Sequence, residues 1–296
     1  MEIARVLCPV DFSDFSRHAL DYAVTIARWY HSTVTALHVV PATATYAGLE
    51  TSPPIPWTSE ELEQIRLRVT RFVQQGGERG VEAMVAEGGL AREILREAER
   101  MPADLLVMGT HGRSGFERFL LGSVTENVLR HASCPVLTVP PKIADPVATG
   151  STSFRRILCA VDFSPSSMKA LEFASSLAQE ADARLTLVHV VEPLPEFVPS
   201  TVRGLDPSEY EHAALRKARG DLHEWVPGGV RVHAAIKEIV VPGKSHQGIL
   251  STAQKEQSEV IVIGVRGRGP VDRLFFGSTA NQIVRRSTCP VLTIRG

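Results

Sequence analysis

Gly109-Thr110-His111-Gly112-Arg113-Ser114-Gly115 is a glycine-rich stretch that continues to Gly122-Ser123. It follows the apolar run 105–108 and precedes an amphipathic segment at 124–131, so the expected order is strand, loop and helix. Glycine has no Cβ and lets a backbone approach a ligand closely, and the first amides of a helix can bind an anion. This order of elements predicts a phosphate-binding loop. The simpler alternative is a tight strand–helix connection that needs glycine for packing.

The chain contains the same arrangement a second time. Gly264-Val265-Arg266-Gly267-Arg268-Gly269 follows the apolar run 260–263 and leads to Gly277-Ser278 at the same spacing. One glycine cluster would be weak support for a ligand site, whereas two clusters at equivalent places favour it.

The repetition extends over the length of a domain. Residues 5–13 return as 156–164, an offset of 151, and residues 134–139 return as 289–294, an offset of 155. The second copy therefore carries a net four additional residues between these landmarks. Repetition on this scale indicates two tandem copies of one fold.

We expect a domain at 1–140, a linker at 141–154 that is rich in Pro, Gly, Ser and Thr, and a second domain at 155–296. Within each domain short apolar segments alternate with amphipathic helical patterns. In the first copy the expected strands are 3–10, 33–40, 81–86, 104–108 and 136–139, and the expected helices are 13–30, 59–75, 90–100 and 124–131. The alternation predicts the α/β class, with a five-stranded parallel sheet in each copy, doubly wound so that helices cover both faces.

The composition is that of a globular protein. Of the 296 residues, 44% are hydrophobic and 22% are charged, and a net charge of −1 argues against a surface built for nucleic acid or acidic membranes. No apolar run reaches the ~20 residues needed to cross a bilayer, and the first residues do not resemble a secretion signal, so we expect a cytoplasmic location. The four cysteines form no Cys-x-x-Cys pair and are expected to be buried thiols.

Polar residues at strand ends are the candidates for ligand contact. Parallel sheets bind ligands at the carboxyl ends of their strands, where the winding direction switches. Asp11 and its counterpart Asp162 follow the first strand of each copy. Residue type alone leaves two roles for them: a turn or helix-cap residue, or a ligand of a ribose or a metal ion. His38 and His189 are expected to be packed at the sheet end, because no acid or nucleophile stands at matching spacing in both copies.

The chain resembles the universal stress protein family, whose nucleotide signature is G-x-x-G, nine residues, then G-[S/T]. The signature fits both copies, at Gly109, Gly112, Gly122-Ser123 and at Gly264, Gly267, Gly277-Ser278. Segments 9–11, 37–40 and 134–136 fit the family as well. The resemblance implies an adenine nucleotide alpha hydrolase-like fold for each copy.

The resemblance also implies that ATP is bound, that Mg²⁺ could accompany it, and that no residue is assigned to catalysis. Asp11 would lie near the ribose and metal, the backbone of Val39 near the adenine, and the glycine loop around the phosphates. In the first copy the implied contacts are Pro9, Val10, Asp11, Val39, Met108, Gly109, His111, Gly112, Arg113, Gly122, Ser123, Val124 and Thr125. In the second copy they are Ala160, Val161, Asp162, Val190, Ile263, Gly264, Arg266, Gly267, Arg268, Gly277, Ser278 and Thr279.

The second copy departs from the first in its signature loop. Arg266 replaces His111, and Pro270 removes a backbone donor that a phosphate could use. The sequence thus leaves open whether one site or both are filled.

The preferred interpretation is an ATP-binding regulatory or protective factor in a stress response. Hydrolysis should be weak or absent because no general base is repeated. The alternatives are an interaction scaffold with a vestigial nucleotide pocket and a slow ATPase. The apolar edges of the last strands, 136–139 and 291–294, are expected to be covered. By the resemblance they pair within the chain as a pseudo-dimer, and a homodimer is a further expectation. We expect no nucleic-acid or membrane partner.

Overall fold

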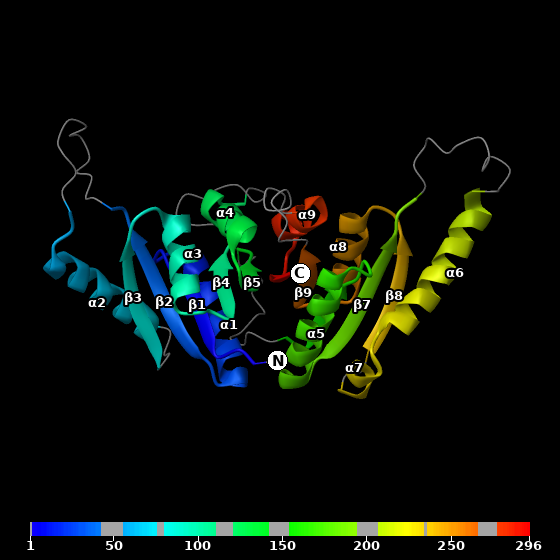
Figure 1. The fold of residues 1–296 in the computed structure, drawn as a ribbon, viewed down its shortest axis with the longest axis horizontal. Helices are drawn as coiled ribbons and strands as arrows, with labels where there is room; N and C mark the ends of the chain where they lie inside the picture. The colour runs from blue at the N-terminus through cyan, green and yellow to red at the C-terminus, as the bar shows by residue number, and fades with distance from the viewer. Residues whose placement is uncertain are drawn as a thin grey trace. The chain divides into compact units, whose positions relative to one another are not determined.

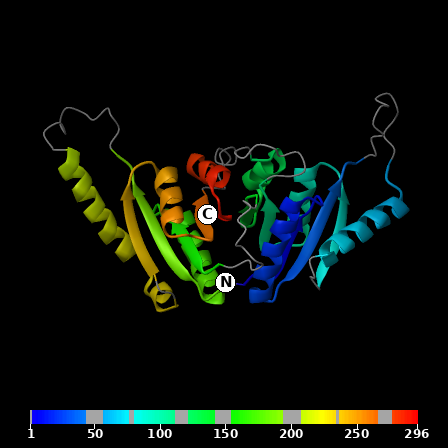
Figure 2. The same cartoon turned by 180° about the vertical axis from the view of Figure 1, so that it is seen from behind.

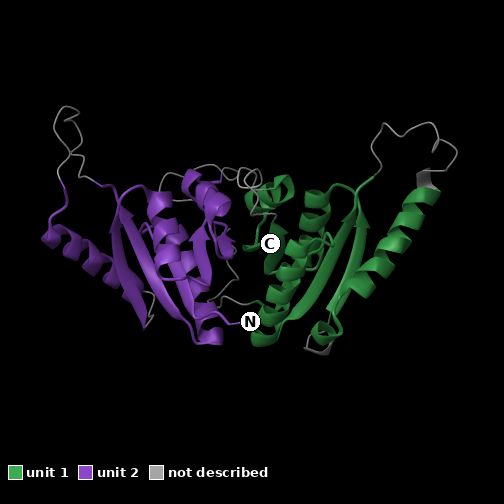
Figure 3. Cartoon of the chain, in the orientation of Figure 1, with its two compact units in different colours: residues 1, 153–296 green, residues 2–152 purple. Residues whose placement is uncertain are grey.

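The computed structural model describes residues 2–42, 56–75, 80–110, 121–141, 154–193, 207–233, 236–265 and 277–296. The chain forms two compact units, one of residues Glu2–Thr152 and one of residues Ser153–Gly296 (Figure 3). Each unit has its own five strands, its own helices and its own buried core.

The first unit is a parallel α/β sheet (Figure 1). Its strands are β1 (Arg5–Pro9), β2 (Thr33–Val40), β3 (Val81–Glu87), β4 (Leu105–Gly109) and β5 (Val136–Val139). Its helices are α1 (Asp14–Tyr30), α2 (Ser59–Gln75), α3 (Leu90–Arg100) and α4 (Ser123–His131). The strand order is β3-β2-β1-β4-β5, so the winding direction switches between β1 and β4.

The second unit repeats this plan. Its strands are β6 (Arg156–Ala160), β7 (Arg184–Val191), β8 (Ile236–Pro242), β9 (Val260–Val265) and β10 (Val291–Arg295). Its helices are α5 (Pro165–Glu180), α6 (Pro207–Trp225), α7 (Gly228–His233), α8 (Ser245–Lys255) and α9 (Ser278–Arg286). The order β8-β7-β6-β9-β10 places the switch between β6 and β9. The predicted α/β class with a five-stranded parallel sheet in each copy is confirmed.

Helices cover both faces of each sheet. In Figure 1, α3 and α4 lie in front of the first sheet, and the reverse view in Figure 2 shows α1 on the other face. In the second unit α5 is in front in Figure 1 and α8 is in front in Figure 2. A central strand enclosed in this way must be apolar on both sides. Accordingly Leu7 and Cys8 of β1, and Leu158 and Cys159 of β6, have no exposed surface.

The four additional residues of the second copy are divided between two places. Phe12 meets the ring of Phe72 edge-on at 5.6 Å, and Phe163 meets Trp225 edge-on at 5.8 Å. Phe72 and Trp225 are therefore equivalent, at an offset of 153, between the earlier offset of 151 and the later one of 155. Two of the extra residues precede Trp225, and two follow it in the region of α7.

The cysteines are free thiols, as predicted. Cys8, Cys134 and Cys159 are buried, and Cys289 is half-buried. Burial raises the pKa of Cys134 to about 11 and that of Cys159 to about 12, because the thiolate would lose its hydration. None of the helices in the described ranges is long and apolar enough to cross a membrane.

Candidate functional site

Each unit has a cleft at the carboxyl ends of its strands, beside the switch point. The cleft of the first unit has a volume of about 470 Å³ and that of the second about 520 Å³. Both volumes are in the range of small-molecule sites. The first is lined by the predicted residues Pro9, Val10, Asp11, Val39, Met108, Gly109, Gly122, Ser123, Val124 and Thr125. The second is lined by the predicted residues Ala160, Val161, Asp162, Val190, Ile263, Gly264, Gly277, Ser278 and Thr279.

The remaining predicted residues are His111, Gly112, Arg113, Arg266, Gly267 and Arg268. They lie outside the described residues. The structure therefore brings the strand ends and helix starts of each signature together, and the middle of each loop stays a prediction.

A tight turn holds the aspartate at the edge of each cleft. The Oδ1 atom of Asp11 accepts hydrogen bonds from the backbone N–H of Ser13 at 3.1 Å and from its hydroxyl at 2.5 Å. Ser13 is in turn the N-cap of α1, because its Oγ accepts from the N–H of Ser16 at 3.2 Å. Asp162 and Ser164 repeat these contacts at the start of α5. Of the two roles left open, the turn role is present, and the helix cap is the serine two residues later.

The residue after each aspartate has a left-handed backbone. Phe12 has φ 65° and Phe163 has φ 62°, which is uncommon for a residue with a Cβ. Their rings contact those of His38 and His189 in a tilted arrangement, with ring centroids 4.4 and 4.5 Å apart respectively. The turn is thus held by its aspartate and by an aromatic contact with the next strand.

The two histidines connect the turn to the neighbouring strand. Nδ1 of His38 lies 2.7 Å from the carbonyl oxygen of Val10, and Nδ1 of His189 lies 2.8 Å from that of Val161. A carbonyl oxygen can only accept, so Nδ1 carries the hydrogen in both rings. Each histidine lies at the sheet end, as expected, and each also lines its cleft, which the sequence analysis missed.

The helix that follows each signature begins at its cleft. Gly122 is the N-cap of α4 and makes no side-chain cap, and the N–H of Glu126 is the one that bonds back to the carbonyl of Gly122. The amides of residues 123–125 precede that bond, and all three residues line the cleft. Gly277 caps α9 in the same way, and residues 278–280 line the second cleft. Unpaired amides and the positive end of the helix dipole make such a helix start attractive to anions.

The glycines of the signature differ in why they are needed. A Cβ on Gly264 would lie 2.4 Å from the carbonyl carbon of Ser166 and 2.6 Å from the amide nitrogen of Ser167, both backbone atoms of α5. A Cβ on Gly122 would lie 3.2 Å from the carbonyl oxygen of Thr110, and one on Gly277 would have no described atom within 4 Å. At Gly264 the packing explanation is therefore correct: this glycine lets β9 lie against the start of α5.

The wall formed by α3 in the first unit and by α8 in the second was also missed from the sequence. Leu90 and Ile94 of α3 line the first cleft, and Ser245 and Ile249 of α8 line the second. These pairs stand at an offset of 155. Their helices follow the outer strands in sequence, and no glycine or charge pattern at these positions pointed to the cleft.

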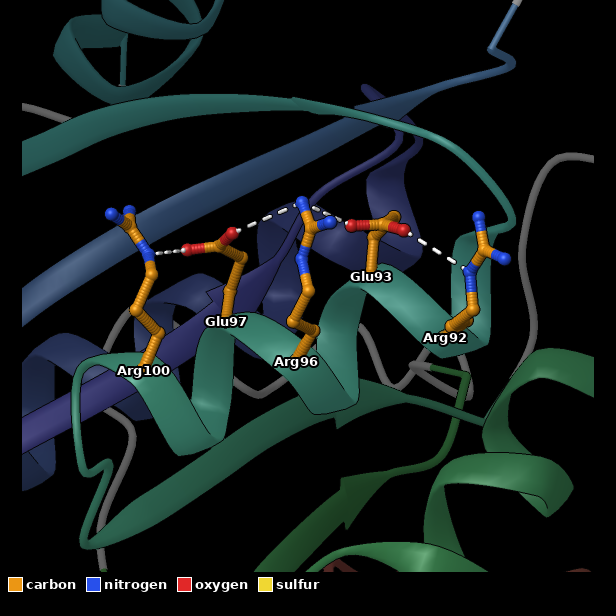
Figure 4. A network of polar contacts seen from close by, with 5 residues as sticks. All are labelled: Arg92, Glu93, Arg96, Glu97 and Arg100. Atoms are coloured by element: carbon orange, nitrogen blue, oxygen red, sulfur yellow. Dashed lines mark hydrogen bonds and ion pairs between the residues drawn. The ribbon is translucent and has the colours of Figure 1, made fainter.

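A network of buried carboxylates supports the wall of the first cleft (Figure 4). Glu93 and Glu97 of α3 have side chains only 1% and 6% exposed. Arg96 contacts Glu93 at 2.5 Å and Glu97 at 3.5 Å, Arg100 contacts Glu97 at 2.6 Å, and Arg92 contacts Glu93 at 3.2 Å. Buried charges of this kind need such partners. The arginines cover the carboxylates on the solvent side of the helix.

The equivalent part of the second unit is packed differently. Gly248 stands at the position of Glu93, and a Cβ there would lie 2.8 Å from Cγ2 of Val190 and 3.2 Å from Cγ2 of Val241. Val241 is paired with Val190 in the sheet, at the position where the first unit has Ala86. Compared with the first unit, the second has less side-chain volume on the helix, at Gly248, and more on the outer strand β8, at Val241.

Metal ligands are sparse in this part of the molecule. Within the ranges that the structure describes, no group of three or more His, Cys, Asp or Glu side chains is placed to bind a metal ion. Asp11 and Asp162 are the acidic residues among the described linings of the two clefts.

Comparison with known proteins gives one family for both halves. A family model described as the universal stress protein family matches residues 2–140 and again residues 153–295. A universal stress protein of Mycobacterium tuberculosis is 26% identical over 300 residues, covering 98% of this chain and 96% of the relative. One from Methanocaldococcus jannaschii is 37% identical over 139 residues, covering 46% of this chain and 81% of the relative. The crystal structure of a universal stress protein from Archaeoglobus fulgidus matches with a TM-score of 0.69 at 24% identity, covering 98% of both chains.

Proposed function

Since the chain belongs to the universal stress protein family, we propose that it binds ATP with Mg²⁺ in two clefts and acts as a regulatory or protective factor in a stress response. The observation that carries this proposal is the start of α4 and of α9. In each copy a glycine N-cap and the first helical residues line a cleft at the switch point of a parallel sheet. A nucleotide joins an anionic phosphate chain to a flat, largely apolar base, and each cleft offers a counterpart to both ends.

The two ends of the first cleft suit different parts of the nucleotide. The amides of residues 123–125 would bind the phosphates, since within the described residues they have no hydrogen-bond acceptor at the helix start. The base would lie against Val39 and Ile94, which line the opposite, apolar side. Asp11, which Ser13 holds in one orientation, would face the ribose and the Mg²⁺ ion, whose preferred ligands are oxygens. The bound ion would supply charge neutralisation for the phosphates.

We expect binding with weak hydrolysis or none. A general base must lie within hydrogen-bond reach of the attacking water. At the phosphate end of the first cleft the described lining consists of Gly122, Ser123, Val124 and Thr125, and the hydroxyl of Thr125 donates to the carbonyl of Gly109 at 3.0 Å. None of these side chains is a base. Four free thiols, three of them buried, favour a reducing compartment such as the cytoplasm for this function.

Proline substitutions at the helix starts test the proposal. Ser123→Pro and Ser278→Pro each remove one amide from the N1 position of a helix, where proline is well tolerated. The preceding glycines have ψ 139° and 140°, which suits a residue before proline. A charge-assisted hydrogen bond contributes roughly 1.5–3 kcal/mol, so each change should weaken ATP–Mg²⁺ binding in its own cleft at least tenfold in calorimetric titration.

Ser123→Ala and Ser278→Ala are the matched controls, because they remove a hydroxyl and keep the amide. They should bind more tightly than the proline variants. If the folded wild-type protein shows no heat of binding with ATP–Mg²⁺, the proposal fails and the scaffold alternative is favoured. ADP release that the proline variants abolish would instead favour the slow ATPase.

A further inference from the structure

The walls of the two clefts differ in chemistry at one matched position. Leu90 begins α3 and lines the first cleft, and its equivalent Ser245 begins α8 and lines the second. Leu90 is 46% exposed although it is a large apolar residue, so it has free surface to offer a ligand. The second cleft therefore has a hydroxyl where the first has an exposed apolar side chain.

Ser245 lies on the side of the second cleft that would hold the base. Ser245 and Ile249 are four residues apart on α8, so they share the face of the helix that lines the cleft. The helix packs against β7, because a Cβ on Gly248 would lie 2.8 Å from Cγ2 of Val190. Val190 and Ile249 correspond to the two residues against which the base would lie in the first cleft. The amides that would bind the phosphates belong to another helix, α9.

The hydrogen of the Ser245 hydroxyl is already used. It is donated to Oε1 of Glu192 at 2.5 Å, and the backbone N–H of Ser245 donates to the same oxygen at 3.1 Å. Glu192 is not among the described residues that line the cleft, so its effect on a ligand passes through this bond. A hydroxyl oxygen has one hydrogen and two lone pairs. While the bond to Glu192 is made, Ser245 can therefore accept a hydrogen bond from a ligand but cannot donate one.

The 6-position of a purine is the part of the base that such a hydroxyl can distinguish. It lies on the six-membered ring, away from the ribose, and it carries an amino donor in adenine and an oxo acceptor in guanine and hypoxanthine. Resting on the proposed function, we propose that Ser245 makes the second cleft selective for a purine nucleotide with a hydrogen-bond donor at the 6-position. At the same place Leu90 lets the first cleft accept an apolar 6-substituent.

Methyl groups give each cleft its own reporter. Ile94 lines the first cleft and Ile249 the second, so NMR titration of the full chain with labelled isoleucine methyl groups measures the two affinities separately. Purine riboside triphosphate lacks only the 6-amino group of ATP. With Mg²⁺ present, the Ile249 methyl should report ATP binding about fivefold tighter than binding of this analogue, the effect of one neutral hydrogen bond. Ser245→Ala should reduce that difference to less than about twofold.

An apolar 6-substituent should affect the two clefts differently. N6,N6-dimethyl-ATP has no donor at the 6-position and carries two methyl groups there. It should bind more weakly than ATP at Ile249 and at least as tightly as ATP at Ile94. Leu90→Ser with Ser245→Leu should exchange these two results.

Glu192→Ala separates the orientation of the hydroxyl from a merely structural role of Ser245. This change frees the hydroxyl to donate, so ITP, whose 6-oxo group accepts, should gain affinity relative to ATP at Ile249. Circular dichroism melting checks that each variant is folded. If the exchanged variant does not fold, Ser245→Ala and Glu192→Ala decide the question.

Two results would overturn the inference. One is equal affinity of the second cleft for ATP and for purine riboside triphosphate, and the other is a preference for ATP that Ser245→Ala leaves unchanged. In either case the methyl shifts that ATP causes leave the proposed function standing. If no nucleotide shifts the methyl resonance of Ile94 or of Ile249, the proposed function and this inference both fail.

Discussion

Replacing Gly264 with alanine tests whether the signature glycine of the second unit is needed for packing. The new Cβ would lie 2.4, 2.5 and 2.6 Å from the C and O atoms of Ser166 and the N atom of Ser167. All three are backbone atoms at the start of α5, so no flexible side chain can move aside. Gly264 lies on β9, and the contact joins a central strand to the helix that covers it.

The expected cost follows from the size of the overlap. Ordinary contacts of a Cβ begin at 3.4 Å, so the start of α5 must move by about 1 Å from its 2.4 Å position. Inserting one methyl group into a well-packed core usually costs roughly 1–3 kcal/mol. Because a whole helix start must shift here, we expect a loss of about 3 kcal/mol in the free energy of unfolding of the second unit.

Urea unfolding followed by hydrogen exchange and mass spectrometry would measure this loss unit by unit. Peptides from 154–193 and 236–265 report on the second unit, and those from the first unit serve as an internal reference. Gly220→Ala is the matched control, because Gly220 lies within α6 and a Cβ there meets no described atom within 4 Å. Alanine favours a helix, so this control should stabilise by about 1 kcal/mol. A change of less than about 0.5 kcal/mol for Gly264→Ala would show that the packing argument is wrong.

Three further predictions concern charge and burial. Arg96→Leu should destabilise the first unit by about 1 kcal/mol, because two buried carboxylates lose a cationic partner; the cost stays moderate since the arginine itself is 60% exposed. Arg66→Leu, which breaks an exposed pair, should leave the stability unchanged in the same denaturation assay. Equal effects of the two substitutions would contradict the argument. Ser245→Ala should lower the melting temperature at neutral pH, because it removes the hydrogen bond that the Ser245 hydroxyl donates to the carboxylate of Glu192. This bond lowers the pKa of Glu192 in the folded protein, so it stabilises the fold above pH 4.5, the ordinary pKa, and the stabilisation is lost as the pH falls through the folded-state pKa. A melting difference from wild type that stays constant with falling pH would exclude this cause. Cys134, whose pKa burial raises to about 11, should react with iodoacetamide only after unfolding, and rapid labelling of the native protein would contradict its burial.

Much of the fold could be predicted because the sequence repeats it. Apolar strand segments of the first half recur in the second half at two offsets, and this recurrence identified both copies. The alternation of strands and helices predicted the parallel pairing that the structure has within each unit. The position of the extra residues could not be predicted. It depends on Phe72 and Trp225 making the same ring contact, and two different aromatic residues in dissimilar helices give no sequence match.

The candidate site was predictable where its residues lie in the repeated segments, and less so elsewhere. His38 was expected to be packed, and its place in the cleft wall follows from its bond to Val10, a contact between β2 and the residue that follows β1. Ile94 and Ser245 come from helices whose approach to the cleft depends on sheet order. Glu93 would be expected at the surface from its residue type, yet Gly88 and Arg96 create a buried place for it.

The central claim is that the helix starts of both units bind the phosphates of a nucleotide. Its most direct test is to follow the backbone amide resonances of Ser123 and Ser278 by NMR while ATP–Mg²⁺ is added. The account predicts that these two amides, with their neighbours at 124–125 and 279–280, show the largest shifts, in the direction of stronger hydrogen bonding. Saturation of the protein with nucleotide while both amides stay unchanged would contradict it.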